Sequence, residues 1–262
     1  MNINSFISRK TDGPPLVLTT AYDFWSAQIV QAAELDGVLV GDSAAMVIHG
    51  HDSTIPATPE MMATHIAAVS RGAPNLLRIG DMPFLSYRKG IKSAMECVDT
   101  FMKAGAHAVK LEGVQGLEEV ITQIIQSGVP VMGHIGLTPQ SVHQLGGFHV
   151  QGTDPEAADR LLQQAKQLED LGCFSMVLEC VPTDLGKRIT EAVRVPTVGI
   201  GAGPHVDGQV LVLHDLAGFN RHFKPKFAKK YADGFGVVQK ALTDFADDVR
   251  NGTYPSENES YK

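Results

Sequence analysis

The sequence predicts an α/β protein folded as a single (β/α)8 barrel. Its 262 residues match the usual size of such barrels, which is about 250 residues. Short apolar runs rich in β-branched residues alternate along the chain with segments of helical spacing. The runs are continuously apolar rather than alternating, which indicates strands buried on both faces, as in a parallel sheet covered by helices.

Eight apolar runs provide the candidate strands. In chain order they begin at Leu16, Gly37, Asn75, Ala106, Val129, Phe174, Val195 and Gly208. Helical spacing is found between most of them, over residues 25–35, 59–71, 92–104, 117–127 and 155–171. The first dozen residues are expected to form a loop or a short helix that closes the barrel floor. We expect one catalytic domain over residues 1–262, ending in a short polar tail.

One connection does not fit a regular barrel. Only residues 204–207 separate GIGAG from the last apolar run. A parallel crossover usually needs a dozen residues or more. A doubly wound open sheet is therefore the alternative fold, although no GxGxxG motif follows the first strand and opens a helix.

Charge and cysteine usage restrict the partners. The chain has 22 Lys and Arg against 29 Asp and Glu, a net charge of -7, so no basic field favours nucleic acid or an anionic membrane. A small-molecule partner is expected instead. Cys97, Cys173 and Cys180 are scattered and form no CxxC pair, which argues against a disulfide framework or a structural zinc site. We therefore expect a cytoplasmic protein without membrane spans.

Ionisable residues follow nearly every predicted strand. They are Asp23, Asp42 with the neighbouring Ser43, Asp81, Lys110 with Glu112, His134, Glu179, and His214 with Asp215. In a parallel barrel these strand ends meet at one mouth. Asp42 taken alone would more simply be a helix cap, but several carboxylates at one mouth repel each other unless a cation neutralises them. Oxygen ligands without a Cys cluster or an HExxH pair favour Mg²⁺.

The same residue types indicate a reaction. A 2-oxo acid could chelate Mg²⁺ through its carboxylate and keto oxygens, and the metal would stabilise an enolate. Lys110 could neutralise the substrate carboxylate or the enolate, with a salt bridge to Glu112 as the alternative. Glu179 ends the apolar run SMVLE, where low polarity suits a general base; a buried structural glutamate is the alternative. His134 joins the site, whereas His49 and His51 are left outside it.

The motifs also resemble a known family over nearly the whole chain. In order they are TAYD, VGDS, HDST, DMPF, AGAHAVKLEG, GVPVMGHIGLTPQSVHQLGG, VLECVP, GIGAG and PKFAKKY. This set resembles the ketopantoate hydroxymethyltransferases, also called 3-methyl-2-oxobutanoate hydroxymethyltransferases. The sequence departs from the family at Gly80, where alanine is expected, at GVQG after LEG, and at PHV before DGQ.

The resemblance implies a barrel of the phosphoenolpyruvate/pyruvate type, Mg²⁺, and a large homo-oligomer, a decamer in bacterial members. It implies hydroxymethyl transfer from 5,10-methylenetetrahydrofolate to 3-methyl-2-oxobutanoate, giving 2-dehydropantoate and tetrahydrofolate in pantothenate synthesis. It assigns the residues as follows: metal binding to Asp42, Asp81 and Glu112, oxo acid binding to Asp42, Ser43, Asp81 and Lys110, and proton abstraction to Glu179. Two alternatives remain: a Mg²⁺-dependent 2-oxo acid lyase or aldolase that needs no folate, and a non-catalytic binding protein.

Overall fold

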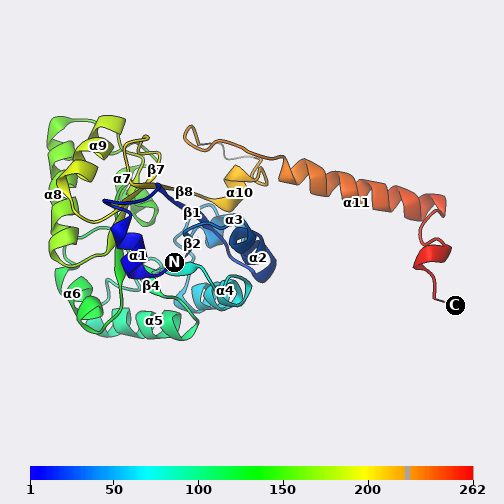
Figure 1. Cartoon of the computed structure of the whole chain (residues 1–262), viewed down its shortest axis with the longest axis horizontal. Helices are drawn as coiled ribbons and strands as arrows, with labels where there is room; N and C mark the ends of the chain where they lie inside the picture. The colour runs from blue at the N-terminus through cyan, green and yellow to red at the C-terminus, as the bar shows by residue number, and fades with distance from the viewer. Residues whose placement is uncertain (222–224, 262) are drawn as a thin grey trace. The chain divides into compact units, whose positions relative to one another are not determined.

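A closed barrel of parallel strands organises most of the chain. The structure is a computed structural model that describes residues 1–221 and 225–261. It divides into two compact units, Met1–Val212 and Leu213–Lys262. The first unit contains eight strands that pair in sequence order, and β8 closes on β1 (Figure 1). The predicted (β/α)8 barrel is confirmed, and the open-sheet alternative is wrong.

The strands are short and almost completely buried. Their bounds are β1 Leu16–Thr20, β2 Gly37–Val40, β3 Leu77–Asp81, β4 Ala108–Lys110, β5 Val131–Gly136, β6 Ser175–Glu179, β7 Thr197–Ile200 and β8 Gly208–Leu211. No helix lies between β7 and β8, yet they pair in parallel, with Val198 opposite Gly208. Strand β7 ends at Ile200 because Gly201 and Gly203 turn the chain with positive φ. Residues 201–207 can span about 3.3 Å each, which is enough to return along a four-residue strand.

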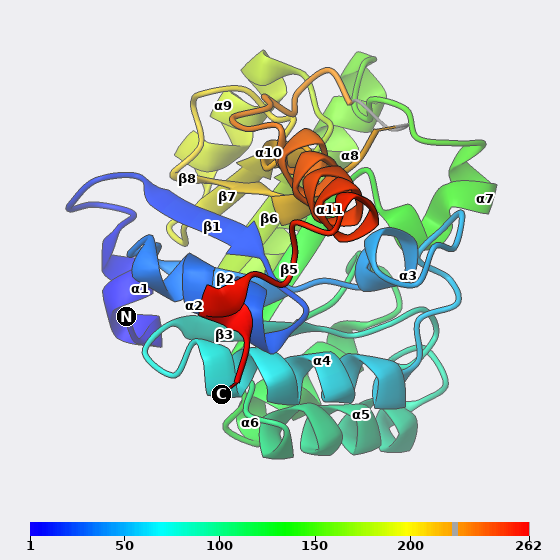
Figure 2. The same cartoon turned by 90° about the vertical axis from the view of Figure 1, so that its right-hand side faces the viewer.

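Nine helices of the first unit lie before, between or after these strands (Figure 2). They are α1 Ile3–Ser8, α2 Phe24–Ala32, α3 Ala44–Val47, α4 Pro59–Gly72, α5 Ile91–Lys103, α6 Glu118–Gln126, α7 Val142–Leu145, α8 Pro155–Asp170 and α9 Thr183–Ala192. The five predicted helical segments correspond to α2, α4, α5, α6 and α8. Polar caps begin three of them: Asp23, Thr58 and Asp154 each accept a hydrogen bond from a backbone N–H in the first turn.

The barrel floor is closed by the N-terminal helix, as expected. Phe6 of α1 is completely buried and packs edge-on against Phe174, with ring centroids 5.5 Å apart. It belongs to an apolar cluster inside the barrel that also includes Leu16, Ile79 and Met132. Because the apolar core of the barrel lies at this end, the opposite ends of the strands can carry polar side chains.

The second unit is mainly one long helix. It contains α10 Leu213–Leu216, α11 Gly234–Asn251 and a 3₁₀ turn at Glu257–Glu259. The unit that contains the barrel ends at Val212. In the predicted polar tail, Ser256 and Glu259 form a capping box. None of the described helices combines the length and apolarity needed to cross a membrane.

Candidate active site

Six ionisable side chains meet at the C-terminal mouth of the barrel. They are Asp42, Asp81, Lys110, Glu112, His134 and Glu179, of which all but the partly exposed Glu179 are buried. The parallel register brings them together, because β3 places Asp81 opposite Lys110 of β4, and β6 places Glu179 opposite Gly136 of β5. The structure therefore gathers the residues that the sequence selected at successive strand ends.

Lys110 forms the main ion pair of this cluster. Its Nζ lies 2.7 Å from Asp81 Oδ1. Burial lowers the pKa of Lys110, but the charges of Asp81, Glu112 and Asp42 outweigh burial and raise it, so the ammonium stays charged. Asp81 Oδ2 in turn accepts a hydrogen bond from the backbone N–H of Asp42 at 3.2 Å. Lys110 thus pairs with Asp81, and not with Glu112 as the salt-bridge alternative assumed.

His134 connects the two glutamates. Its Nε2 lies 3.2 Å from Glu179 Oε2, and its Nδ1 lies 3.5 Å from Glu112 Oε1 and 3.3 Å from Lys110 Nζ. Burial and Lys110 lower the pKa of His134, whereas its contacts with Glu112 and Glu179 raise it to about 9. The His134 ring therefore borders the Glu179 carboxylate, and 16% of the Glu179 side chain remains exposed at the mouth.

Gln140 cross-links the cluster and was missed by the sequence analysis. Its Nε2 donates to Asp42 Oδ2 at 2.9 Å, and its backbone N–H donates to Glu112 Oε2 at 3.0 Å. Tyr87 Oη donates to Gln140 Oε1 at 2.7 Å. Gln140 lies in a 3₁₀ turn, Pro139–Ser141, inside the glycine-rich segment that follows β5. That segment has no strand or helix periodicity, so the TPQ turn was the only sequence signal that could have indicated a role for Gln140.

Ser43 and Asp23, two further residues that follow strands, have different structural roles. Ser43 Oγ lies next to Asp42 and shares a hydrogen bond with Tyr22 Oη at 2.8 Å. Asp23, by contrast, caps α2 by accepting from Ser26 N–H at 2.8 Å. Asp23 is therefore a helix cap, whereas Asp42 is not. His214 and Asp215 belong to the second unit.

The donor set at the mouth fits a hard divalent cation. Burial, followed by repulsion from Asp81 and Glu112, raises the pKa of Asp42 well above its ordinary value, and a bound cation would relieve this strain. Asp81 Oδ1 is buried, and its charged contact is the 2.7 Å ion pair with Lys110. Within residues 1–221 and 225–261, no three Asp, Glu, His or Cys side chains are close enough to hold an ion as they stand. Mg²⁺ commonly takes only one or two carboxylates and fills its shell with water and substrate oxygens, which matches Asp42 and Asp81.

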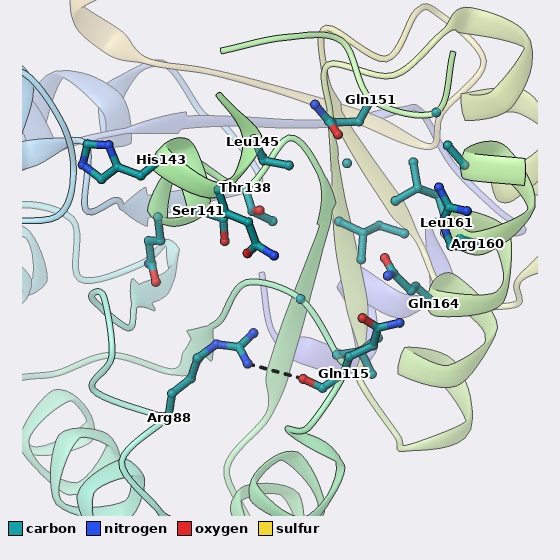
Figure 3. Close-up of a pocket in the computed structure, with 18 of the residues that line it drawn as sticks. Arg88, Gln115, Thr138, Ser141, His143, Leu145, Gln151, Arg160, Leu161 and Gln164 are labelled. Atoms are coloured by element: carbon teal, nitrogen blue, oxygen red, sulfur yellow. Dashed lines mark hydrogen bonds between the residues drawn. The ribbon is translucent and has the colours of Figure 1, made fainter. Parts of the chain in front are cut away.

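A cavity of about 690 Å³ opens beside the cluster (Figure 3). Its walls come from the segments after β4 and β5 and from α8, and Gln140 belongs to both the cavity wall and the acid cluster. The volume lies within the range of about 300–1,000 Å³ that is typical of small-molecule sites.

Comparison with known proteins gives consistent matches over the full chain. A family model described as ketopantoate hydroxymethyltransferase matches residues 1–257. A 3-methyl-2-oxobutanoate hydroxymethyltransferase of Coxiella burnetii is 53% identical over 256 residues, covering 97% of this chain and 96% of the relative. The protein of the same name from Bdellovibrio bacteriovorus is 52% identical over 259 residues, covering 99% and 98%. That of Thermotoga maritima is 48% identical over 246 residues, covering 94% and 91%.

Solved structures show the same fold at low identity. The phosphoenolpyruvate phosphomutase of Streptomyces platensis aligns with a TM-score of 0.64 at 13% identity, covering 100% of this chain and 92% of that one. A 2,3-dimethylmalate lyase, described as a member of the PEP mutase/isocitrate lyase superfamily, aligns with a TM-score of 0.59 at 15% identity, covering 99% and 91%. These two structures confirm the (β/α)8 barrel fold.

Proposed function

This chain belongs to the ketopantoate hydroxymethyltransferase family, and from that premise we propose that it makes 2-dehydropantoate. The reaction combines 3-methyl-2-oxobutanoate, 5,10-methylenetetrahydrofolate and water to give 2-dehydropantoate and tetrahydrofolate, within pantothenate biosynthesis. One observation carries the proposal: relatives of that name are about 50% identical over nearly the whole chain. The buried cluster of acids, lysine and histidine is consistent with it.

We assign the oxo acid to the centre of the mouth. Asp42, Ser43, Asp81 and Lys110 would bind it, and His134 would border it. Lys110 is buried and charged, so its ammonium stabilises negative charge on the bound oxo acid far better than it would in water. The hydroxyl of Ser43, which lies 2.8 Å from Tyr22 Oη, would donate a hydrogen bond to the substrate carboxylate.

Glu179 is the proposed proton acceptor for C3 of the oxo acid. It is the one carboxylate of the cluster that is not buried, so it can reach a substrate in the mouth. His134 Nε2 lies 3.2 Å from Glu179 Oε2, and this contact limits the directions that the carboxylate can take. When the C3–H bond breaks, its proton goes to Glu179 and the electron pair stays on the oxo acid as an enolate. The C3 carbon then forms a bond to the methylene carbon of the donor, and the two bonds from that carbon to the folate nitrogens break. Water supplies the hydroxyl oxygen, and the proton from Glu179 and one proton from water end on the two nitrogens of tetrahydrofolate.

Asp42 and Asp81 are the proposed direct ligands of Mg²⁺, with Glu112 as the third metal-binding residue. Glu112 accepts a hydrogen bond from Gln140 N–H at 3.0 Å and lies 3.5 Å from His134 Nδ1, and its carboxylate would hold the ion together with Asp42 and Asp81. When bound, Mg²⁺ supplies a Lewis acid that withdraws charge from the keto oxygen. Gln140 holds Asp42 Oδ2 at 2.9 Å and thereby keeps that oxygen oriented.

A turnover assay with one component omitted at a time tests the proposal. The complete mixture of protein, Mg²⁺, 3-methyl-2-oxobutanoate and 5,10-methylenetetrahydrofolate should form 2-dehydropantoate, and omission of either the folate or the metal should stop it. Product formation or substrate cleavage without folate would instead identify a lyase or aldolase. No reaction in the complete mixture would contradict the enzyme.

We also propose a large homo-oligomer, a decamer by family resemblance, located in the cytoplasm. Helix α11 leaves apolar side chains such as Val237, Leu242 and Phe245 exposed in the single chain, and a face of this kind is usually covered by protein. The three cysteines are free, as in reducing compartments. A solution mass near 28.1 kDa at micromolar concentration would contradict the oligomer.

A further inference from the structure

The cavity beside the acid cluster is far larger than a small branched oxo acid requires. It holds about 690 Å³, and one end of its wall is Gln140, which donates to Asp42 Oδ2 at 2.9 Å. The other wall is α8, where Ala157, Arg160, Leu161 and Gln164 recur at helical spacing and line one face. The cavity therefore extends from Gln140, beside the acid cluster, to α8. Figure 3 shows Arg160, Leu161 and Gln164 on the wall across from Ser141 and Leu145.

The lining of this cavity is basic and rich in amides, in a chain of net charge -7. Its ionisable residues are Arg88, His143 and Arg160, and none of the described lining residues is an aspartate or a glutamate. Besides Gln140, the lining includes four glutamines: Gln115, Gln144, Gln151 and Gln164. Such a wall suits an anionic ligand that also carries a flat ring with alternating hydrogen-bond donors and acceptors.

The two arginines differ in how firmly they are held. The Arg88 guanidinium donates to the backbone carbonyls of Glu112 at 3.2 Å and of Gln115 at 3.3 Å, so it helps to build the wall. Arg160 has an exposed ion pair with Glu156, 2.8 Å long, in which the two side chains are 56% and 87% exposed. A pair of this kind contributes little, so Arg160 can exchange Glu156 for a ligand carboxylate.

We propose that this cavity is the site of the one-carbon donor, with the pterin toward Gln140 and the carboxylates of the glutamate tail on Arg160. The inference rests on the proposed function, because the methylene carbon must reach the oxo acid beside Asp42. The orientation follows from charge: the inner end borders buried carboxylates, which repel an anionic tail, and the outer end offers the more readily available guanidinium.

Calorimetric binding of two ligands tests this orientation. Tetrahydrofolate carries the glutamate tail, and tetrahydropteroate is the same ring system without it. The wild-type protein should bind tetrahydrofolate about tenfold more tightly, as expected for one charge-assisted contact at a partly exposed site. In Arg160→Gln the two dissociation constants should become similar, and Arg160→Lys should give an intermediate ratio because lysine keeps the charge but not the forked geometry.

Arg188→Gln is the matched control. Arg188 is also half exposed and also pairs with an acid of α8, Asp159, at 2.9 Å, but it does not line the cavity. It should keep the wild-type ratio. Equal binding of both ligands by the wild type, an unchanged ratio in Arg160→Gln, or no binding of tetrahydrofolate would each overturn the inference. Arg160-dependent binding without any turnover of the oxo acid would retain the donor site and reject the proposed transferase instead.

Discussion

The two ends of the barrel use the same eight strands for opposite purposes. At the floor, Phe6 of α1 packs on Phe174 and closes an apolar interior that includes Leu16 and Met132. At the mouth, the interior holds buried charged groups such as Asp42, Asp81 and Lys110. Apolar burial stabilises the fold, whereas buried charges lower its stability unless they are paired. Substitutions at the two ends should therefore separate stability from activity.

The largest effect is expected from Asp42→Asn and Asp81→Asn. A neutral amide is a poor ligand for a hard cation, so each change should reduce turnover by more than the roughly 10–100-fold typical of residues that only orient a ligand. Turnover measured against Mg²⁺ concentration checks this. Near-normal activity of both variants at limiting metal would contradict the site.

Asp42→Asn and Asp81→Asn should differ in stability, although both should lose most of their activity. Because the pKa of Asp42 is raised, its ionised form costs stability once the pH exceeds the ordinary carboxyl pKa, and Asp42→Asn removes that cost at neutral pH. The pKa of Asp81 is also raised by burial, so Asp81→Asn removes a cost of the same kind. It also leaves Lys110 buried without its partner at 2.7 Å, which costs about 3 kcal/mol and outweighs that gain. Chemical denaturation without metal should show Asp42→Asn at least as stable as the wild type and Asp81→Asn less stable. The reverse order would refute this account of the charges.

Phe6→Ala probes the floor. Loss of a completely buried phenylalanine should lower the free energy of unfolding by about 3–5 kcal/mol. Turnover at a temperature well below unfolding should stay near the wild-type value, since Phe6 lies at the opposite end of the strands. A large loss of activity in the folded variant would show that the two ends are coupled.

Gln140→Ala tests the cross-link between Asp42 and Glu112. It removes the donor at 2.9 Å from Asp42 Oδ2, and we expect a 10- to 100-fold lower turnover, with weaker Mg²⁺ binding. Gln164→Ala is a suitable control, because Gln164 lines the cavity but is not described as contacting the acid cluster. A smaller loss of metal affinity in Gln140→Ala than in this control would exclude the orienting role.

The smallest effect is expected from Tyr22→Phe. It removes the 2.8 Å hydrogen bond to Ser43 Oγ while keeping the ring. One such bond contributes about 0.5–1.5 kcal/mol, so the KM for the oxo acid should rise a few-fold with little change in kcat. An unchanged KM would show that Ser43 needs no orientation by Tyr22.

The mouth was predictable from sequence to the extent that its residues directly follow apolar runs. Asp42, Asp81, Lys110, Glu112, His134 and Glu179 all come at or within two residues of a strand end, and parallel strands bring such positions together. Asp23 shows the limit of this reasoning: β1 ends at Thr20, so Asp23 is already the cap of the next helix.

Gln140 and the donor cavity were not predictable in the same way. Gln140 reaches the cluster from a 3₁₀ turn after β5, where no periodic pattern indicates which side chains face inward. Arg160 is one of several polar residues on the outer side of α8, and only the three-dimensional structure shows that it lines the cavity. The short connection between β7 and β8 was not predictable either, because its length depends on where β7 ends, which is at Ile200.

Exchange of the C3 proton of 3-methyl-2-oxobutanoate in D₂O tests the central claim most directly. The chain with Mg²⁺ and the oxo acid should exchange this proton without any folate, because base and charge stabilisation are both present at the mouth. Glu179→Gln should lose exchange by a factor on the order of 10² or more, whereas Glu191→Gln, an exposed change on α9, should not. If Glu179→Gln exchanged at the wild-type rate, Glu179 would not be the base.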